Sequence, residues 1–157
     1  MSSNVLGIIA PHPPIMVEAV GREQSAVTSD SITALRETAE LLRRFDPDTV
    51  VVMSPHAPAV ADAFAVDTAP SYYGSFAQFG AARAAYRHQG DQKLARRLLE
   101  RLDAAGIPAV DRGATSMDSG VLDHGALVPL HFLDPDGRFP LVEVSLSWLS
   151  YDLHRQL

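Results

Sequence analysis

The 157-residue chain contains no cysteine, which excludes disulfide bonds and thiolate metal ligands. It also has no apolar run long enough to span a bilayer. Its N-terminus lacks the basic segment, apolar stretch and cleavage site that together form a secretory signal. We therefore expect a cytoplasmic protein that does not contact a membrane.

Basic residues are also scarce. Lys and Arg number 13 against 19 Asp and Glu, which gives a formal net charge of -6. A surface that binds nucleic-acid phosphates needs clustered Lys and Arg, so we expect no nucleic-acid partner. The glycine patterns of dinucleotide-binding and P-loop proteins are absent as well. The length and the hydrophobic fraction of 46% are typical of one globular domain with a core.

Two short segments of the chain share one design. The apolar run 5–10 leads through a proline into His12, and the run 50–54 leads through a proline into His56. Each run predicts a strand buried on both faces, which stops near its proline because proline cannot donate to a β-ladder. We expect both histidines just past the carboxyl ends of parallel strands, where open α/β sheets place their ligands.

Two imidazoles held at one rim of a sheet predict a metal site. A single histidine after a strand is more often an ordinary loop residue, but the repeated context of His12 and His56 favours metal binding. Without cysteine the ligands must be His, Asp or Glu, a set that suits iron, manganese or zinc. The spacing does not distinguish iron from zinc.

The remaining patterns predict a mostly parallel central sheet with helices on both faces, in a single α/β domain over residues 1–157. The segment 69–80 carries Pro, Gly and aromatic residues without a period, and we expect an irregular loop or a lid there. The other elements we expect are strands at 64–66, 107–110 and 139–146, helices at 25–45, 91–105 and 123–133, and the opening of a helix at 151–157.

A third histidine of interest, His124, falls at the start of a predicted helix. The adjacent Gly125 would let a ligand come close. A helix N-terminus lowers the pKa of a histidine, so a neutral imidazole that can accept a proton is expected at this position. We expect His131, on the same helix, to be structural, and His88 and His154 to lie on the surface.

Three motifs occur in a fixed order: Pro-His-Pro-Pro at 11–14, Ser-Pro-His at 54–56 and Asp-His-Gly-x-x-Val-Pro-Leu at 123–130. In these motifs the sequence resembles the LigB superfamily over essentially its whole length. That superfamily includes the catalytic subunits of class III extradiol ring-cleaving dioxygenases and the Memo-like proteins. The motifs together are specific for the superfamily, but they do not separate its ring-cleaving members from the others.

The resemblance implies roles for individual residues. It makes His12 and His56 ligands of a non-haem Fe(II), with Zn or Mn as alternatives, and His124 an acid/base beside the metal. The family's remaining ligand is a glutamate near the C-terminal end of a considerably longer domain, and the sequence offers no match for it. Glu143 lies in a predicted strand and does not fit the family's order.

We therefore expect residues 1–157 to be the N-terminal portion of an incomplete LigB-like domain, with activity that depends on the absent carboxylate. A sheet edge left uncovered by the missing part would favour a homo-oligomer or a partner chain. Three functions remain open. They are an Fe(II) extradiol dioxygenase that cleaves a catecholic ring with O2, a Memo-like metal- or protein-binding protein without that activity, and a metal-dependent hydrolase.

Overall fold

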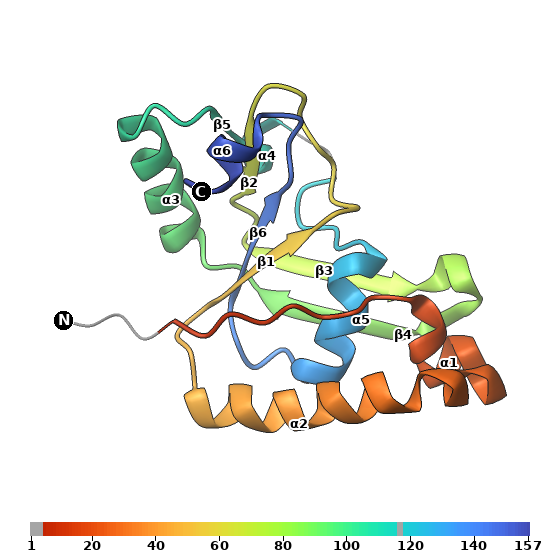
Figure 1. Ribbon diagram of the computed structural model, residues 1–157. Coiled ribbons are helices and arrows are strands. Elements are labelled where there is room, and N and C mark those ends of the chain that lie inside the picture. The colour runs from red at the N-terminus through yellow and green to blue at the C-terminus, as the bar shows by residue number, and fades with distance from the viewer. Residues whose placement is uncertain (1–4, 116–117) are drawn as a thin grey trace.

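The computed structural model describes residues 5–115 and 118–157, and it confirms the α/β fold class (Figure 1). A four-stranded sheet runs in the order β1-β6-β2-β5, with β1 and β6 parallel and β2 and β5 parallel. The central pair β2 and β6 is antiparallel, so the sheet is mixed. The strands are β1 (Val50–Ser54), β2 (Phe64–Asp67), β5 (Ala109–Asp111) and β6 (Leu141–Ser145).

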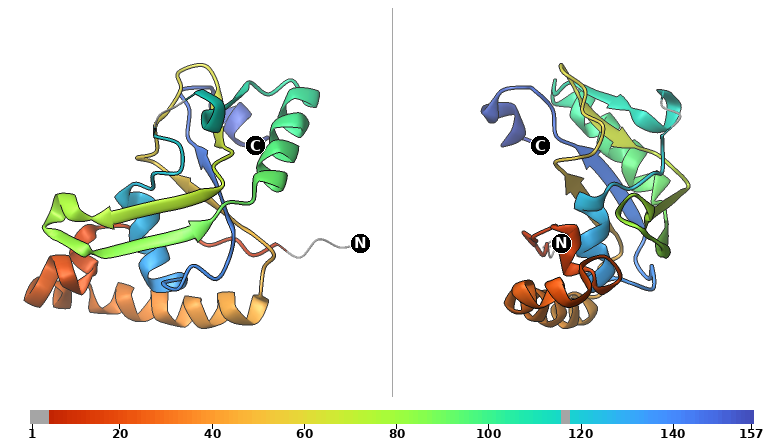
Figure 2. Two further views of the ribbon diagram at one scale, coloured as in Figure 1. Left: turned by 180° about the vertical axis from the view of Figure 1, so that it is seen from behind. Right: turned by 90° about the vertical axis from the view of Figure 1, so that its right-hand side faces the viewer.

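Helices pack against both faces of this sheet (Figures 1 and 2). Successive side chains of β6 point to opposite faces of the sheet. Leu141 packs in the larger hydrophobic core, with α2 and α5. Val142 and Val144 pack in a smaller core on the other face, with α3 and α6. The helices are α1 (Glu18–Gly21), α2 (Ser29–Phe45), α3 (Gln92–Ala104), α4 (Arg112–Thr115), α5 (His124–Leu133) and α6 (Tyr151–His154), and the short 3-10 turns are η1 (Pro14–Met16), η2 (Arg22–Thr28) and η3 (Ala77–Phe79).

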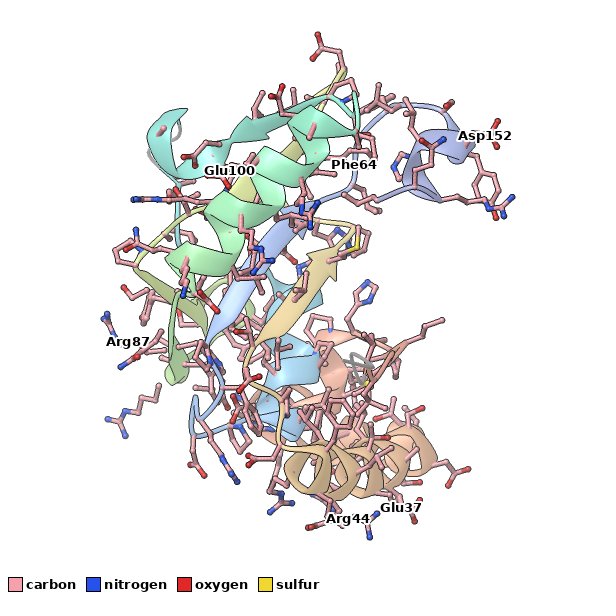
Figure 3. All side chains as sticks on the ribbon, turned by 90° about the vertical axis from the view of Figure 1, so that its left-hand side faces the viewer. Glu37, Arg44, Phe64, Arg87, Glu100 and Asp152 are labelled. Atoms are coloured by element: carbon pink, nitrogen blue, oxygen red, sulfur yellow. The ribbon has the colours of Figure 1, made fainter. Side chains whose placement is uncertain are left out.

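The helices α3 and α5 begin and end within one residue of the predicted bounds, whereas α2 begins at Ser29, four residues later than predicted, because η2 precedes it. Asp91 caps α3 by accepting a hydrogen bond from the Leu94 amide at 2.9 Å, and Gly106 follows the helix with a φ of 70°. Charged residues such as Glu37 and Arg44 point from α2 toward solvent (Figure 3). Within the described part of the chain, no helix is long and apolar enough to cross a membrane.

The prediction of a strand at 5–10 is wrong. This segment is extended and lies near β1, but it makes no ladder with the sheet. Its alternate residues Leu6, Ile8 and Ala10 pack against the larger core. These side chains are partly buried by packing on one face of the segment, and this burial does not require a β-ladder. An apolar run therefore does not by itself specify a hydrogen-bonding partner. The strand β1 is consequently an edge, and its Val51 and Met53 remain 49% and 46% exposed rather than buried.

The prediction of an irregular loop at 69–80 is also wrong. Strand β3 (Ser71–Phe76) pairs with β4 (Ala81–Gln89) in an antiparallel hairpin, with Tyr72 and Phe76 buried in the larger core. Gly74 obscured the strand pattern in the sequence. A Cβ atom at this position would lie 2.6 Å from the Leu127 side chain and 2.9 Å from the Leu122 carbonyl oxygen, so a larger residue would force these neighbours to shift.

Two of the minor histidine predictions also change. His88 is 1% exposed on β4, with Nδ1 at 3.4 Å from Asp134 Oδ2, so its assignment to the surface is wrong. Asp134 accepts backbone hydrogen bonds from the loop after α5, and His88 packs against this anchor. His154 is half-buried and contacts the ring of Phe64 edge-on. His131 contacts the Tyr86 hydroxyl through Nδ1, as expected of a structural residue.

Candidate metal and catalytic site

Two of the singled-out histidines meet at the end of β1. His12 follows the extended segment 5–10 and His56 follows β1, and their Nε2 atoms lie 3.2 Å apart. The rings are edge to face, with centroids at 5.2 Å. At this distance one neutral imidazole donates a hydrogen bond to the other. Flanking prolines restrict the backbone on either side of each ring.

His124, the first residue of α5, completes a group of three imidazoles. Its ring is stacked on that of His56 with centroids 4.2 Å apart, and its centroid lies 6.1 Å from that of His12. The ring of Phe79 meets His124 edge-on from the β3–β4 hairpin. The fold thus brings together the three histidines that the sequence marks, from three separate segments.

The pKa of His124 is lowered from its ordinary value of 6.5. Burial is the main cause, the imidazole of His56 contributes next, and the nearby carboxylate of Asp123 acts in the opposite direction. The lowered pKa agrees with the expectation from the sequence. Its main cause, however, is burial and not the helix N-terminus. The imidazole is therefore neutral at pH 7 and can accept a proton.

A serine and an aspartate hold the ends of β1 and α5 together. The Ser54 hydroxyl donates to Asp123 Oδ1 at 2.7 Å and accepts from the His56 amide at 3.2 Å. The same Asp123 oxygen caps α5 by accepting from the Gly125 amide at 2.6 Å. Ser54 and Asp123 belong to the motifs at 54–56 and 123–130, but the sequence predicts no role for either residue. Their signal in the sequence is their position, because Asp123 directly precedes His124 and Ser54 lies two residues before His56.

Gly125 makes this arrangement possible. A Cβ atom there would lie 2.4 Å from Ser54 Oγ and 3.0 Å from a ring carbon of His56. The glycine expected to admit a ligand therefore admits the protein's own serine and histidine.

Comparison with known proteins identifies the family of this chain. Residues 6–156 match the family model described as the catalytic LigB subunit of aromatic ring-opening dioxygenase. The chain belongs to the LigB family. It is also 28% identical over 147 residues to Protein CA_C1420 of Clostridium acetobutylicum, a match covering 90% of this chain and 31% of that protein. The chain thus spans about a third of the length of this relative.

Because LigB proteins generally bind a metal, we asked whether the residues of this site could hold a metal ion. Two nitrogens 3.2 Å apart can both bind one ion at about 2.1 Å, with an angle at the metal of about 100°. The two imidazoles therefore fit part of a metal's coordination sphere. Within residues 5–115 and 118–157, however, no three His, Asp or Glu side chains are grouped so as to hold a metal.

The carboxylate of Glu143 is engaged elsewhere, in a buried ion cluster on the sheet. Arg112 donates to Glu143 Oε2 at 2.5 Å and to Asp67 Oδ2 at 2.5 and 3.0 Å. Burial raises the pKa of Glu143 to about 7, against the opposing charge of Arg112 and with a contribution from Asp123. This placement agrees with the expectation that Glu143 does not supply the family's metal ligand.

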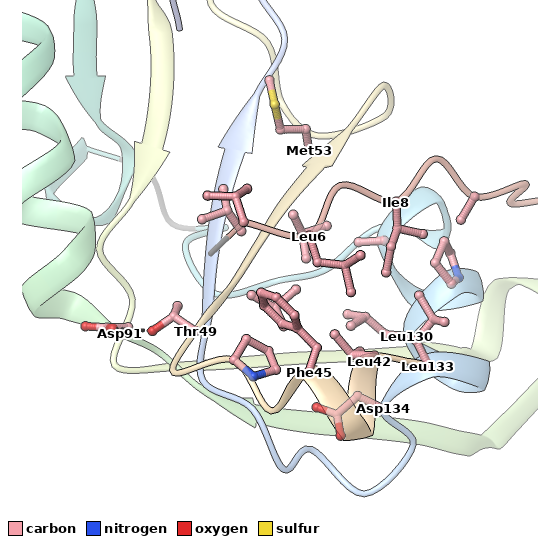
Figure 4. Close-up of a pocket in the computed structure, with 18 of the residues that line it drawn as sticks. Leu6, Ile8, Leu42, Phe45, Thr49, Met53, Asp91, Leu130, Leu133 and Asp134 are labelled. Carbon is pink, nitrogen blue, oxygen red and sulfur yellow. Dashed lines mark hydrogen bonds between the residues drawn. The ribbon is translucent and has the colours of Figure 1, made fainter. Parts of the chain in front are cut away.

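A long groove leads away from the histidines. It lies between the extended segment 5–10 and β1, with a volume of about 1620 Å³, and it includes His12 in its lining (Figure 4). Leu6, Ile8 and Phe45 give the groove an apolar wall.

Proposed function

We propose that this chain supplies the two histidine ligands and the acid/base of a non-haem Fe(II) extradiol dioxygenase, which opens a catecholic ring with O2. The observation that carries the proposal is the 3.2 Å separation of the His12 and His56 Nε2 atoms beside the stacked ring of His124. Membership of the LigB family supports the reaction class. The particular catechol is left open.

His12 and His56 would hold the metal as neutral imidazoles. Fe(II), when bound, supplies coordination positions for both catechol oxygens and for O2. The proposal takes the third protein ligand, a carboxylate, from a segment or partner chain outside the described residues. The exposed edge of β1 supports a homo-oligomer or a partner chain, because an unpaired edge is a ready site for another strand. Since Fe(II) persists best in a reducing compartment, the proposal places the activity in the cytoplasm.

His124 would act on protons. Its neutral imidazole accepts a proton from a catechol hydroxyl and returns it as the ring opens. Acid–base assistance of this kind accelerates reactions by about a hundredfold to ten-thousandfold. The neighbouring Phe79 supports this role, because its ring shields one side of His124 from water.

Anaerobic titration of the chain with Fe(II), followed by a panel of catechols and measurement of O2 uptake, tests the proposal. The titration is run with and without acetate, whose carboxylate can replace an absent ligand. We expect Fe(II) to bind, acetate to tighten binding, and a catechol to give a coloured ring-opened product.

The other outcomes separate the remaining functions. Metal binding without O2 uptake would favour a Memo-like metal-binding protein. Metal-dependent cleavage of esters or amides would favour a hydrolase. A chain that binds no metal under either condition would overturn the proposal.

A further inference from the structure

We propose that Ser54 and Asp123 form a positioning pair, which fixes the metal ligand His56 relative to the acid/base His124 and supports the metal's charge. This inference rests on the proposed function. It gives a role to two residues for which neither the sequence motifs nor the family match provides one. Throughout, the positioning pair means Ser54 and Asp123.

The hydrogen bonds of the Ser54 hydroxyl join the two elements that carry the histidines. Ser54 Oγ is shared between the Asp123 carboxylate at the start of α5 and the amide of His56 at the end of β1. The β1 ladder does not need this hydroxyl, because the backbone of Ser54 pairs with Ser145 of β6. The hydroxyl instead joins the two elements that carry the histidines, and Ser54 is fully buried.

The two carboxylate oxygens of Asp123 differ in their surroundings. Capping α5 uses only Oδ1, and Asn or Ser would cap equally well without a charge. Oδ2 is buried and has no hydrogen-bond partner within the described structure. A buried carboxylate oxygen in that state is unfavourable unless positive charge lies nearby. A divalent cation held by the adjacent imidazoles would provide such a charge.

A second pair at the other end of β1 serves as a control, although there each carboxylate oxygen accepts one hydrogen bond. The Thr49 hydroxyl donates to Asp91 Oδ2 at 2.6 Å, and Asp91 Oδ1 caps α3 (Figure 4). This pair also joins β1 to a helix N-terminus, but at the opposite end of the strand from the histidines. It has the structural duties of the positioning pair without the neighbouring imidazoles.

The test compares matched variants of the two pairs. Ser54→Ala removes the shared hydroxyl, and Asp123→Asn keeps the cap acceptor while removing the charge. Thr49→Ala and Asp91→Asn make the same changes in the control pair. Each variant is titrated with Zn(II) and Co(II) by calorimetry, and its thermal unfolding is recorded without metal. The visible spectrum of the Co(II) form reports the ligand geometry independently of catalysis.

We expect Ser54→Ala and Asp123→Asn to weaken metal binding by about tenfold to a hundredfold, as is usual for residues that orient metal ligands. The Co(II) spectrum of Ser54→Ala should shift as well. Both control variants should bind metal like the wild type. Without metal, Asp123→Asn should unfold at a temperature no lower than Asp91→Asn. Weaker metal binding by Asp123→Asn would then come from the lost carboxylate charge and not from a less stable fold.

Equal metal affinity in the wild type, Ser54→Ala and Asp123→Asn would overturn the positioning role alone. Equal weakening by the control variants would also overturn it, because a general loss of stability would then explain the effect. A wild-type chain that binds no metal would overturn the proposed function and the positioning role together.

Discussion

The imidazole rings of His56 and His124 are stacked with centroids 4.2 Å apart, although one follows a strand and the other begins a helix. Burial is the main cause of the lowered pKa of His124, and the imidazole of His56 lowers it further because two adjacent rings do not readily carry positive charge together. We therefore predict that the two residues have different roles. His56 binds the metal, and His124 accepts and donates a proton.

His124→Phe tests that division. The substitution keeps an aromatic ring against His56 and removes the proton-accepting nitrogens. We expect metal affinity close to that of the wild type and catechol turnover reduced by about a hundredfold to ten-thousandfold. Calorimetry and O2 uptake measure the two quantities. A collapse of metal affinity would show that His124 is itself a ligand.

Replacement of His12 or His56 by alanine should abolish stabilisation by metal. A ligand at a hundred times its Kd stabilises the state that binds it by about 2.7 kcal/mol. We expect this gain for the wild type and little or none for His12→Ala and His56→Ala, measured by chemical unfolding with and without Zn(II). His154→Ala is the control, because that ring contacts Phe64 and lies outside the histidine group. Retained stabilisation in His12→Ala would contradict the assignment.

The sequence predicted the parts of this site that depend on local patterns. The ends of α3 and α5 follow from Asp91 and Asp123, because an N-cap is a local interaction. The three histidines were marked by their places after apolar runs or at a helix start, and the structure gathers them. Their chemical roles remain predictions.

The features that depend on distant contacts were not predictable in this way. The burial of His88 and the pairing of β3 with β4 come from tertiary packing around a segment rich in Ala and Arg. The Ser54 hydrogen bond to Asp123 joins residues far apart in the chain, so no local pattern announces it. At residues 5–10 the sequence predicted a strand that the structure does not contain. An apolar pattern favours burial, but it does not guarantee hydrogen bonds to a neighbouring strand.

Glu143 should make stability depend on pH. Its folded-state pKa of about 7 lies above the ordinary 4.5, so the folded state binds this proton more tightly than the unfolded state. The stabilisation that this proton gives to the folded state is complete below pH 4.5 and is lost as the pH rises through 7. The loss is on the order of 3 kcal/mol. Subtracting the unfolding free energies of Glu143→Gln from those of the wild type, between pH 4.5 and 8, isolates this change. A difference that stays constant across this range would contradict the raised pKa.

Arg112→Met should strongly destabilise the fold. It leaves Asp67 and Glu143 buried without their shared cation, and breaking a buried ion pair from one side costs about 3 to 5 kcal/mol. Arg138→Met is the matched control, because Arg138 pairs with Asp46 at an exposed position where such pairs contribute about 1 kcal/mol or less. Urea unfolding at pH 7 compares the two variants. Similar losses would show that the cluster does not require its arginine.

Gly125→Ala sets helix propensity against packing. Alanine is favoured over glycine inside a helix by about 1 kcal/mol, so propensity alone predicts a more stable α5. The added Cβ would lie 2.4 Å from Ser54 Oγ, however, and crowding of this kind costs about 1 to 3 kcal/mol. We expect packing to dominate, so that the variant unfolds more easily and binds metal more weakly as Ser54 and His56 are displaced. Gly7→Ala is the control, because a Cβ at Gly7 meets nothing within 4 Å. Full stability and wild-type metal affinity in Gly125→Ala would show that the end of β1 adapts without disturbing the histidines.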